Sequence, residues 1–145
     1  MEMRIHSPWT VTLDLESRLD VLADVQEAVS RLAAAVALDE DAAMDVGVAV
    51  RESVINAIKH GNQMDLGKHV HVSLAVHDES IEVEVADEGP GFDPDSLPDP
   101  VDAANLLRPD GRGILFMRSF MDDVTYSFPR TGGTVVHMRK RLAAL

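Results

Sequence analysis

A carboxylate, an amide and an imidazole recur at four-residue spacing within residues 51–62. Glu52, Asn56 and His60 stand at i, i+4 and i+8, so a helix over this segment would present all three on one face. A carboxylate and an amide oxygen on one stripe can supply a general base and a ligand for a hard cation such as Mg²⁺. The spacing is equally typical of the solvated face of an amphipathic helix, whose other face would carry Val50, Val54, Ala57 and Ile58. Taken alone, the segment favours this second interpretation.

Asp87 follows a strand-like run at residues 81–85 and is itself followed by Gly89 and Gly91. An aspartate at the end of a strand can accept a hydrogen bond from an exocyclic amine. Glycines at alternating positions let the backbone approach a ligand closely. A plain Gly-Pro turn between two elements is the alternative, and this segment alone does not separate the two.

Gly111, Arg112 and Gly113 precede a short helix that is predicted to end at Met121. Backbone amides at a helix N-terminus, with an arginine beside them, suit phosphate oxygens. The alternative is an ordinary glycine-containing loop, because a single GxG is a weak signal. Other nucleotide-binding motifs are missing: there is no GxxxxGK[ST], no GxGxxG opening a βαβ unit, and no eukaryotic-type kinase signature.

Two helices are predicted in the first half of the chain. Apolar residues recur at helical spacing over residues 22–36, in a helix that Asp14 or Ser17 would cap. A second helix is predicted from the acidic turn at residues 39–41, where negative charge suits a helix N-terminus. It would run to Gly61, a residue type that often ends helices.

Alternation of apolar and polar side chains predicts five strands, at residues 9–13, 70–76, 81–85, 124–128 and 134–139. The last four form two hairpins. Residues 87–110 are rich in Gly, Pro and Asp and make a long connection of the kind that is usually functional. The order predicts an α+β fold, a two-layer sandwich with helices packed on one face of a mixed, mostly antiparallel sheet.

The composition is that of a globular protein. The 145 residues predict a single domain over residues 1–145, with 46% apolar and 26% charged residues and no cysteine. A formal charge of −12 would repel a phosphate backbone, so no direct nucleic-acid partner is expected. No apolar run approaches the ~20 residues that span a bilayer, and no signal peptide is recognisable. We therefore expect a cytoplasmic protein without a membrane partner.

His69 and His71 share one face of a predicted strand, with His77 farther along. Histidines at this spacing raise the question of a zinc site. We expect an ordinary polar strand face instead, because no carboxylate or cysteine completes a tetrahedral set in the sequence pattern.

Taken together, the clusters resemble the Bergerat-type ATP-binding domains shared by gyrase and histidine kinases. Residues 51–62 resemble the N box of these domains, residues 87–92 the first glycine box and residues 111–117 the second. Gly133 and Thr134 resemble their closing Gly-Thr pair. Within this superfamily, the run GRGILFMRS at residues 111–119, followed by MDDV at 121–124, is similar to the small anti-sigma-factor serine/threonine kinases. The resemblance extends over residues 10–140.

The resemblance implies a role for each matching residue at the phosphate end of the site. Glu52 would be the base that activates the attacking hydroxyl, and Asn56 would be the metal ligand, holding a Mg²⁺ ion that bridges the phosphates. Gly111 and Gly113 would belong to the flexible end of a lid over the phosphates. Arg112, beside them, is our candidate for a contact to the γ-phosphate. These roles suit phosphoryl transfer, which needs mainly positioning and charge neutralisation.

At the base end of the site, the resemblance implies that Asp87 binds the adenine amino group. Gly89 and Gly91 would make room beside the base. Thr134 would help to fix adenine through a water molecule. The expected cofactors are accordingly ATP and Mg²⁺.

The resemblance implies an ATP- and Mg²⁺-dependent serine/threonine protein kinase that acts as an anti-sigma factor in transcription regulation. Its partners would be a sigma factor and an anti-sigma-factor antagonist that it phosphorylates. The alternatives are a non-catalytic, nucleotide-gated binding module, and an ATP-binding regulator of a partner unrelated to sigma factors. Glu52 favours catalysis, because nucleotide binding alone needs no base. The family likeness also allows a homodimer, to which residues 9–13 would contribute as an exposed edge.

Overall fold

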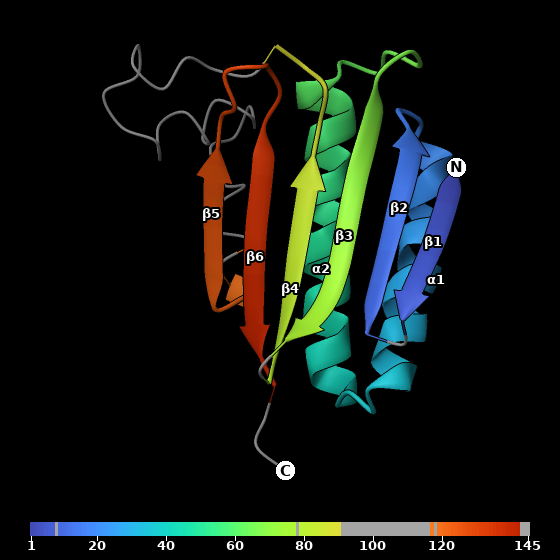
Figure 1. Ribbon diagram of the computed structural model, residues 1–145, viewed down its shortest axis with the longest axis vertical. Coiled ribbons are helices and arrows are strands. Elements are labelled where there is room, and N and C mark those ends of the chain that lie inside the picture. The colour runs from blue at the N-terminus through green and yellow to red at the C-terminus, as the bar shows by residue number, and fades with distance from the viewer. Residues whose placement is uncertain (8, 78, 91–116, 118, 143–145) are drawn as a thin grey trace.

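The computed structural model describes residues 1–7, 9–77, 79–90, 117 and 119–142. Within them, an open six-stranded sheet forms one layer and two helices form the other (Figure 1). The strands are β1 (Glu2–Ser7), β2 (Thr10–Glu16), β3 (His69–His77), β4 (Ser80–Ala86), β5 (Asp123–Ser127) and β6 (Val135–Arg141). This confirms the predicted two-layer α+β class.

The strands follow the order β1-β2-β3-β4-β6-β5, and each neighbouring pair is antiparallel. Both predicted hairpins are confirmed, as β3–β4 and β5–β6. The expected mixture of strand directions is not seen in the part of the sheet that the structure describes. Because β6 lies between β4 and β5, the end of β4 meets the start of β6, where Ala86 pairs with Val135.

The edge of the sheet differs from the prediction. Residues 9–13 fall on β2, which is hydrogen-bonded to β1 on one side and β3 on the other, so they are not an edge. The edge strands are β1 and β5, and of these the sequence analysis missed β1. Met3 and Ile5 pair with Leu13 and Val11, but two apolar residues among charged ones give too short an alternation to predict a strand.

The helical layer contains η1 (Leu19–Val21), α1 (Leu22–Ala35), α2 (Glu40–Asn56) and the π-helical turn η2 (Ala57–Gly61). The predicted start of the second helix is confirmed, with Asp39 Oδ1 accepting a hydrogen bond from the Asp41 N–H at 3.4 Å. The predicted caps of the first helix are wrong. Asp14 lies within β2, and the Ser17 hydroxyl donates to the Lys68 carbonyl at 2.5 Å, because β2 runs through Glu16.

The third predicted helix lies mostly outside the described residues. Met117, Ser119 and Phe120 are helical, and Met117 is buried. Among the helices that the structure describes, none combines the length and the apolar character needed to cross a membrane.

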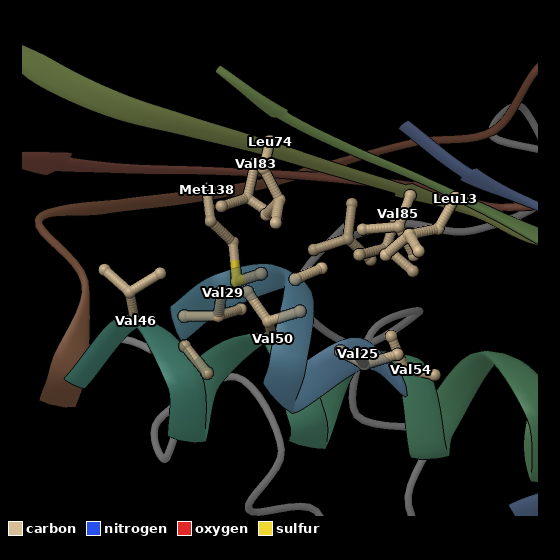
Figure 2. Packing of buried hydrophobic residues seen from close by; sticks show 14 of the residues in the cluster. Leu13, Val25, Val29, Val46, Val50, Val54, Leu74, Val83, Val85 and Met138 are labelled. Carbon is tan, nitrogen blue, oxygen red and sulfur yellow. The ribbon is translucent and has the colours of Figure 1, made fainter. Parts of the chain in front are cut away.

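The core lies between the two layers (Figure 2). Valines of α1 and α2 point toward the inner face of the sheet, where they meet apolar residues of β2, β3, β4 and β6: Val25, Val29, Val46, Val50 and Val54 against Leu13, Leu74, Val83, Val85 and Met138. Burying one such side chain contributes about 1.5–3 kcal/mol. This packing fixes the rotation of α2 about its axis and therefore sets where its polar residues lie.

Candidate active site

The candidate site lies at the end of the sheet where α2 ends, β4 ends and β6 begins (Figure 1). A narrow pocket there is lined by Ser53, Asn56, Ala57, Val85, Asp87, Tyr126, Thr134 and Val136. It lies between the helical layer and the sheet and encloses about 10 Å³. Three residues that the sequence analysis singled out, Asn56, Asp87 and Thr134, therefore share one pocket although they come from three separate segments.

The Asp87 carboxylate is held firmly by the backbone around it. Its Oδ1 accepts hydrogen bonds from the N–H groups of Gly89, at 3.0 Å, and Thr134, at 3.1 Å. Its own N–H donates to the Thr134 carbonyl at 3.0 Å. Burial raises the pKa of Asp87 above its usual value, although the two backbone donors and the charge of Lys68 act in the opposite direction. A buried carboxylate of this kind gains from a further hydrogen-bond donor in a ligand.

Three glycines let the chain close around Asp87. A Cβ on Gly61 would overlap the Asp87 carboxylate, and a Cβ on Gly89 would overlap the Gly61 carbonyl. Gly133, at a φ of 83°, comes so close to the Asp87 carbonyl that a Cβ would overlap it too. Glycine is thus required at all three positions because the turns pack too closely to admit a Cβ atom.

Glu52 and Asn56 lie one helical turn apart on α2. Asn56 is only 8% exposed, and Oε1 of the half-buried Glu52 is also buried. The two positions are therefore not on the solvated face of an amphipathic helix. The π-helical turn that follows Asn56 interrupts the α-helical repeat on which the alignment of His60 with the other two depends.

The residues present fit a magnesium nucleotide. The Asn56 amide offers an oxygen atom, a donor that Mg²⁺ accepts, and the Glu52 carboxylate lies one turn away on α2 as a candidate base. Within the pocket, Val85 and Val136 provide apolar walls and Asp87 provides a hydrogen-bond acceptor. Apolar walls with a few fixed polar groups are typical of sites for a flat heterocyclic base.

Four predicted site residues lie outside the described residues: Gly91, Gly111, Arg112 and Gly113. The room beside the base that was expected from Gly91 therefore stays a prediction. The phosphate lid that was expected from Gly111, Arg112 and Gly113 also stays a prediction.

The sequence analysis gave no role to several residues of the site. Ser53 and Tyr126 line the pocket. Asn62 is buried beside it and joins three segments: Oδ1 accepts from the Glu88 N–H at 2.8 Å, and Nδ2 donates to the His69 carbonyl and to Ser17 Oγ, both at 3.0 Å. The positions of Ser53 and Asn62 inside the N-box segment were the usable signal, whereas the contacts of Asn62 and the place of Tyr126 depend on long-range pairing.

The histidine pair lies beside two carboxylates, contrary to the reason given for excluding zinc. His69 Nδ1 is 2.6 Å from Asp14 Oδ1, and His71 Nε2 is 3.3 Å from Glu88 Oε2. The backbone N–H of His69 also donates to Glu88 Oε1 at 2.6 Å, and this bond is the main cause of the lowered pKa of Glu88. Even so, no three such side chains within the described ranges are arranged to hold a metal ion.

The six-stranded antiparallel sheet with its helical layer is the fold of a histidine kinase-like ATPase domain. The family described as "Histidine kinase-like ATPase domain" matches residues 15–140. The chain belongs to this family and, within it, to the anti-sigma-factor kinases.

Two relatives and one solved structure illustrate the likeness. The anti-sigma F factor of Clostridium acetobutylicum is 33% identical over 70% of this chain and 71% of its own length. The serine-protein kinase RsbW of Halalkalibacterium halodurans is 27% identical over 97% of this chain and 88% of its own. The structure of the RsbU and RsbW domains of a Mycobacterium tuberculosis protein has the same fold, with a TM-score of 0.70 at 18% identity, over 94% of this chain and 33% of that one.

Proposed function

We propose that the protein is an ATP- and Mg²⁺-dependent serine/threonine protein kinase that acts as an anti-sigma factor in the cytoplasm. Its partners would be a sigma factor and an antagonist protein, which it phosphorylates to regulate transcription. The names of its relatives support this role. The observation that carries the proposal is the buried Asp87 carboxylate, held by two backbone N–H groups in a pocket shared with Asn56 and Thr134.

In this proposal Asp87 accepts a hydrogen bond from the adenine amino group, and Thr134 helps to fix the base. Gly89 supports Asp87 through its backbone N–H, and Gly91 would complete the room beside the base. Asn56, with its amide oxygen, would hold the Mg²⁺ ion. When bound, this ion neutralises charge on the phosphates.

Glu52 would act as the general base. It would take the proton of the serine or threonine hydroxyl of the antagonist while the hydroxyl oxygen bonds to the γ-phosphorus and ADP leaves. Its position one turn before Asn56 on α2 places it next to the proposed metal ligand. Gly111, Arg112 and Gly113 would cover the phosphates, and this excludes water from the transfer.

Nucleotide binding and phosphoryl transfer test the proposal separately. Calorimetry with ATP and Mg²⁺ would compare the wild type with Glu52→Gln, and labelled ATP would then follow transfer to a candidate antagonist. Glu52→Gln should bind ATP like the wild type but transfer phosphate roughly 10²–10⁴-fold more slowly, because it has lost the base. Glu82→Gln, which replaces an exposed carboxylate on β4, is the matched control and should change neither quantity.

The results separate the candidate functions. A wild type that does not bind ATP at millimolar concentration would contradict the proposal as a whole. ATP binding without transfer to any antagonist would instead favour the nucleotide-gated binding module. Co-purification with a sigma factor tests that partner. If no sigma factor co-purifies while phosphoryl transfer to the antagonist is intact, the protein would be a kinase that regulates a partner unrelated to sigma factors.

A further inference from the structure

Ser53 carries a buried hydroxyl that the fold itself does not use. The residue lies on α2 and is 1% exposed. Its Oγ has no hydrogen-bond partner among the residues that the structure describes. A serine inside a helix ordinarily faces solvent or donates to the carbonyl four residues earlier, and Ser53 does neither. Because an unpaired buried hydroxyl is unfavourable, this one calls for an explanation.

The hydroxyl belongs to a residue that lines the pocket of Asp87. Ser53 borders the pocket from the helical layer, whereas Asp87 and Thr134 border it from the segments after β4 and before β6. Val85 and Val136 contribute only apolar surface to the same walls. A ligand in this pocket would therefore meet both the Asp87 carboxylate and Ser53.

We infer that Ser53 is a further base-binding residue, whose hydroxyl donates a hydrogen bond to a ring nitrogen of the purine that Asp87 holds by its amino group. The inference rests on the proposed function, since it needs a nucleotide in this pocket. Asp87 accepts from the base and Ser53 donates to it. The pair thus recognises an edge on which an amine and a bare ring nitrogen occur together, as they do in adenine.

This role predicts opposite effects on stability and on binding. In the free protein, Ser53→Ala removes an unpaired hydroxyl, so its melting temperature should be unchanged or higher than that of the wild type. With nucleotide, the variant lacks one hydrogen bond, and its Kd should be about three- to tenfold weaker. A purely structural role for the hydroxyl would lower the melting temperature instead.

The experiment measures melting temperatures without ligand and Kd by calorimetry for ATP and for ADP, both with Mg²⁺. Ser53→Ala should weaken both nucleotides by the same factor, because the base is common to them. Ser73→Ala, on the outer face of β3, is the matched control and should bind like the wild type. Weakening confined to ATP would place the contact at the phosphates and overturn the inference.

Purine riboside triphosphate, which lacks the amino group, separates the two base contacts. Ser53→Ala should raise the Kd for this analogue by the same factor as the Kd for ATP. Asp87→Asn should raise the Kd for the analogue much less than the Kd for ATP. If Asp87→Asn weakens ATP but Ser53→Ala binds like the wild type, the inference about Ser53 fails and the proposed function stands. If the wild type binds no ATP, both fail.

Discussion

Asp87 has opposing effects on folding and on the proposed binding. Its carboxylate accepts two backbone hydrogen bonds, yet burial dominates and raises its pKa. The folded chain therefore disfavours the charged form, which is the form that best accepts a hydrogen bond from an amine. Residues selected for binding commonly reduce stability in this way.

Asp87→Asn should separate the two effects. Asparagine keeps a carbonyl oxygen for the N–H groups of Gly89 and Thr134 but carries no charge to desolvate. We expect the free energy of unfolding at neutral pH to be unchanged or higher, and ATP affinity to fall roughly ten- to hundredfold, since a charged acceptor is lost. Urea unfolding and calorimetry measure the two quantities. Asp20→Asn, at an exposed carboxylate, is the control; a clear loss of stability in Asp87→Asn would refute the argument.

The raised pKa of Asp87 also predicts a pH dependence. A group whose folded-state pKa lies above its unfolded value stabilises the fold fully below that unfolded value, 3.8 for an aspartate, and this contribution is lost as pH rises through the folded pKa. The stability advantage of Asp87→Asn over the wild type should therefore grow with pH above 3.8 and then level off. Unfolding both proteins in urea from about pH 4 to 7 tests this. An advantage that shrinks with rising pH would contradict it.

At the scale of elements, the junction around Asn62 positions the proposed base-binding segment. Asn62 follows η2 and bonds to the backbone of Glu88, just after β4, and of His69, at the start of β3. Its third bond reaches Ser17, just after β2. One amide therefore fixes how the strand ends meet next to Asp87.

Asn62→Ala should loosen this junction. The Glu88 N–H and the His69 carbonyl would lose their partner, and we expect about 2–3 kcal/mol less stability. ATP affinity should fall as well, because Glu88, the residue next to Asp87, loses its hydrogen bond to Asn62. Urea unfolding and calorimetry, with Lys59→Ala on the exposed side of η2 as control, test both effects. Full ATP affinity in Asn62→Ala would show that Asp87 is held in place without this junction.

The elements that the sequence predicted are those with a local signal. Both hairpins alternate over enough residues, and α2 begins at an acidic cap. β1 was missed because its pairing with β2, rather than its own composition, makes it a strand. The π-helical turn at Ala57–Gly61 was missed because nothing in its composition separates it from an α-helical turn.

The same distinction holds within the site. Asn56, Asp87 and Thr134 stand in recognisable motifs, and the structure brings them into one pocket. Tyr126 and Asn62 reach the site through sheet order and long-range hydrogen bonds, which no local spacing encodes. Motif spacing therefore indicated three of the residues that share the pocket, and their roles toward a nucleotide stay predictions.

At the scale of the whole molecule, the pocket lies between the two layers. Ser53 and Asn56 belong to the helical layer, whereas Val85, Tyr126 and Val136 belong to the sheet. A ligand bound there would contact both layers at the end of the sheet opposite the β3–β4 turn. Binding should therefore stabilise the fold as a unit, since a ligand that binds only the folded state shifts the unfolding equilibrium.

This stabilisation predicts a thermal shift that depends on the metal. At a hundredfold excess over Kd, ATP with Mg²⁺ adds about 2.7 kcal/mol, or roughly 5–10 °C for a domain of this size. Chelating Mg²⁺ with EDTA should remove most of the shift, because the phosphates would then face Glu52 and an acidic molecule without a neutralising ion. In Asn56→Ala, which lacks the proposed metal ligand, the residual shift should respond little to EDTA. A wild-type shift that EDTA leaves intact would mean that the nucleotide is held through its base alone, and would remove Mg²⁺ and Asn56 from the proposed mechanism.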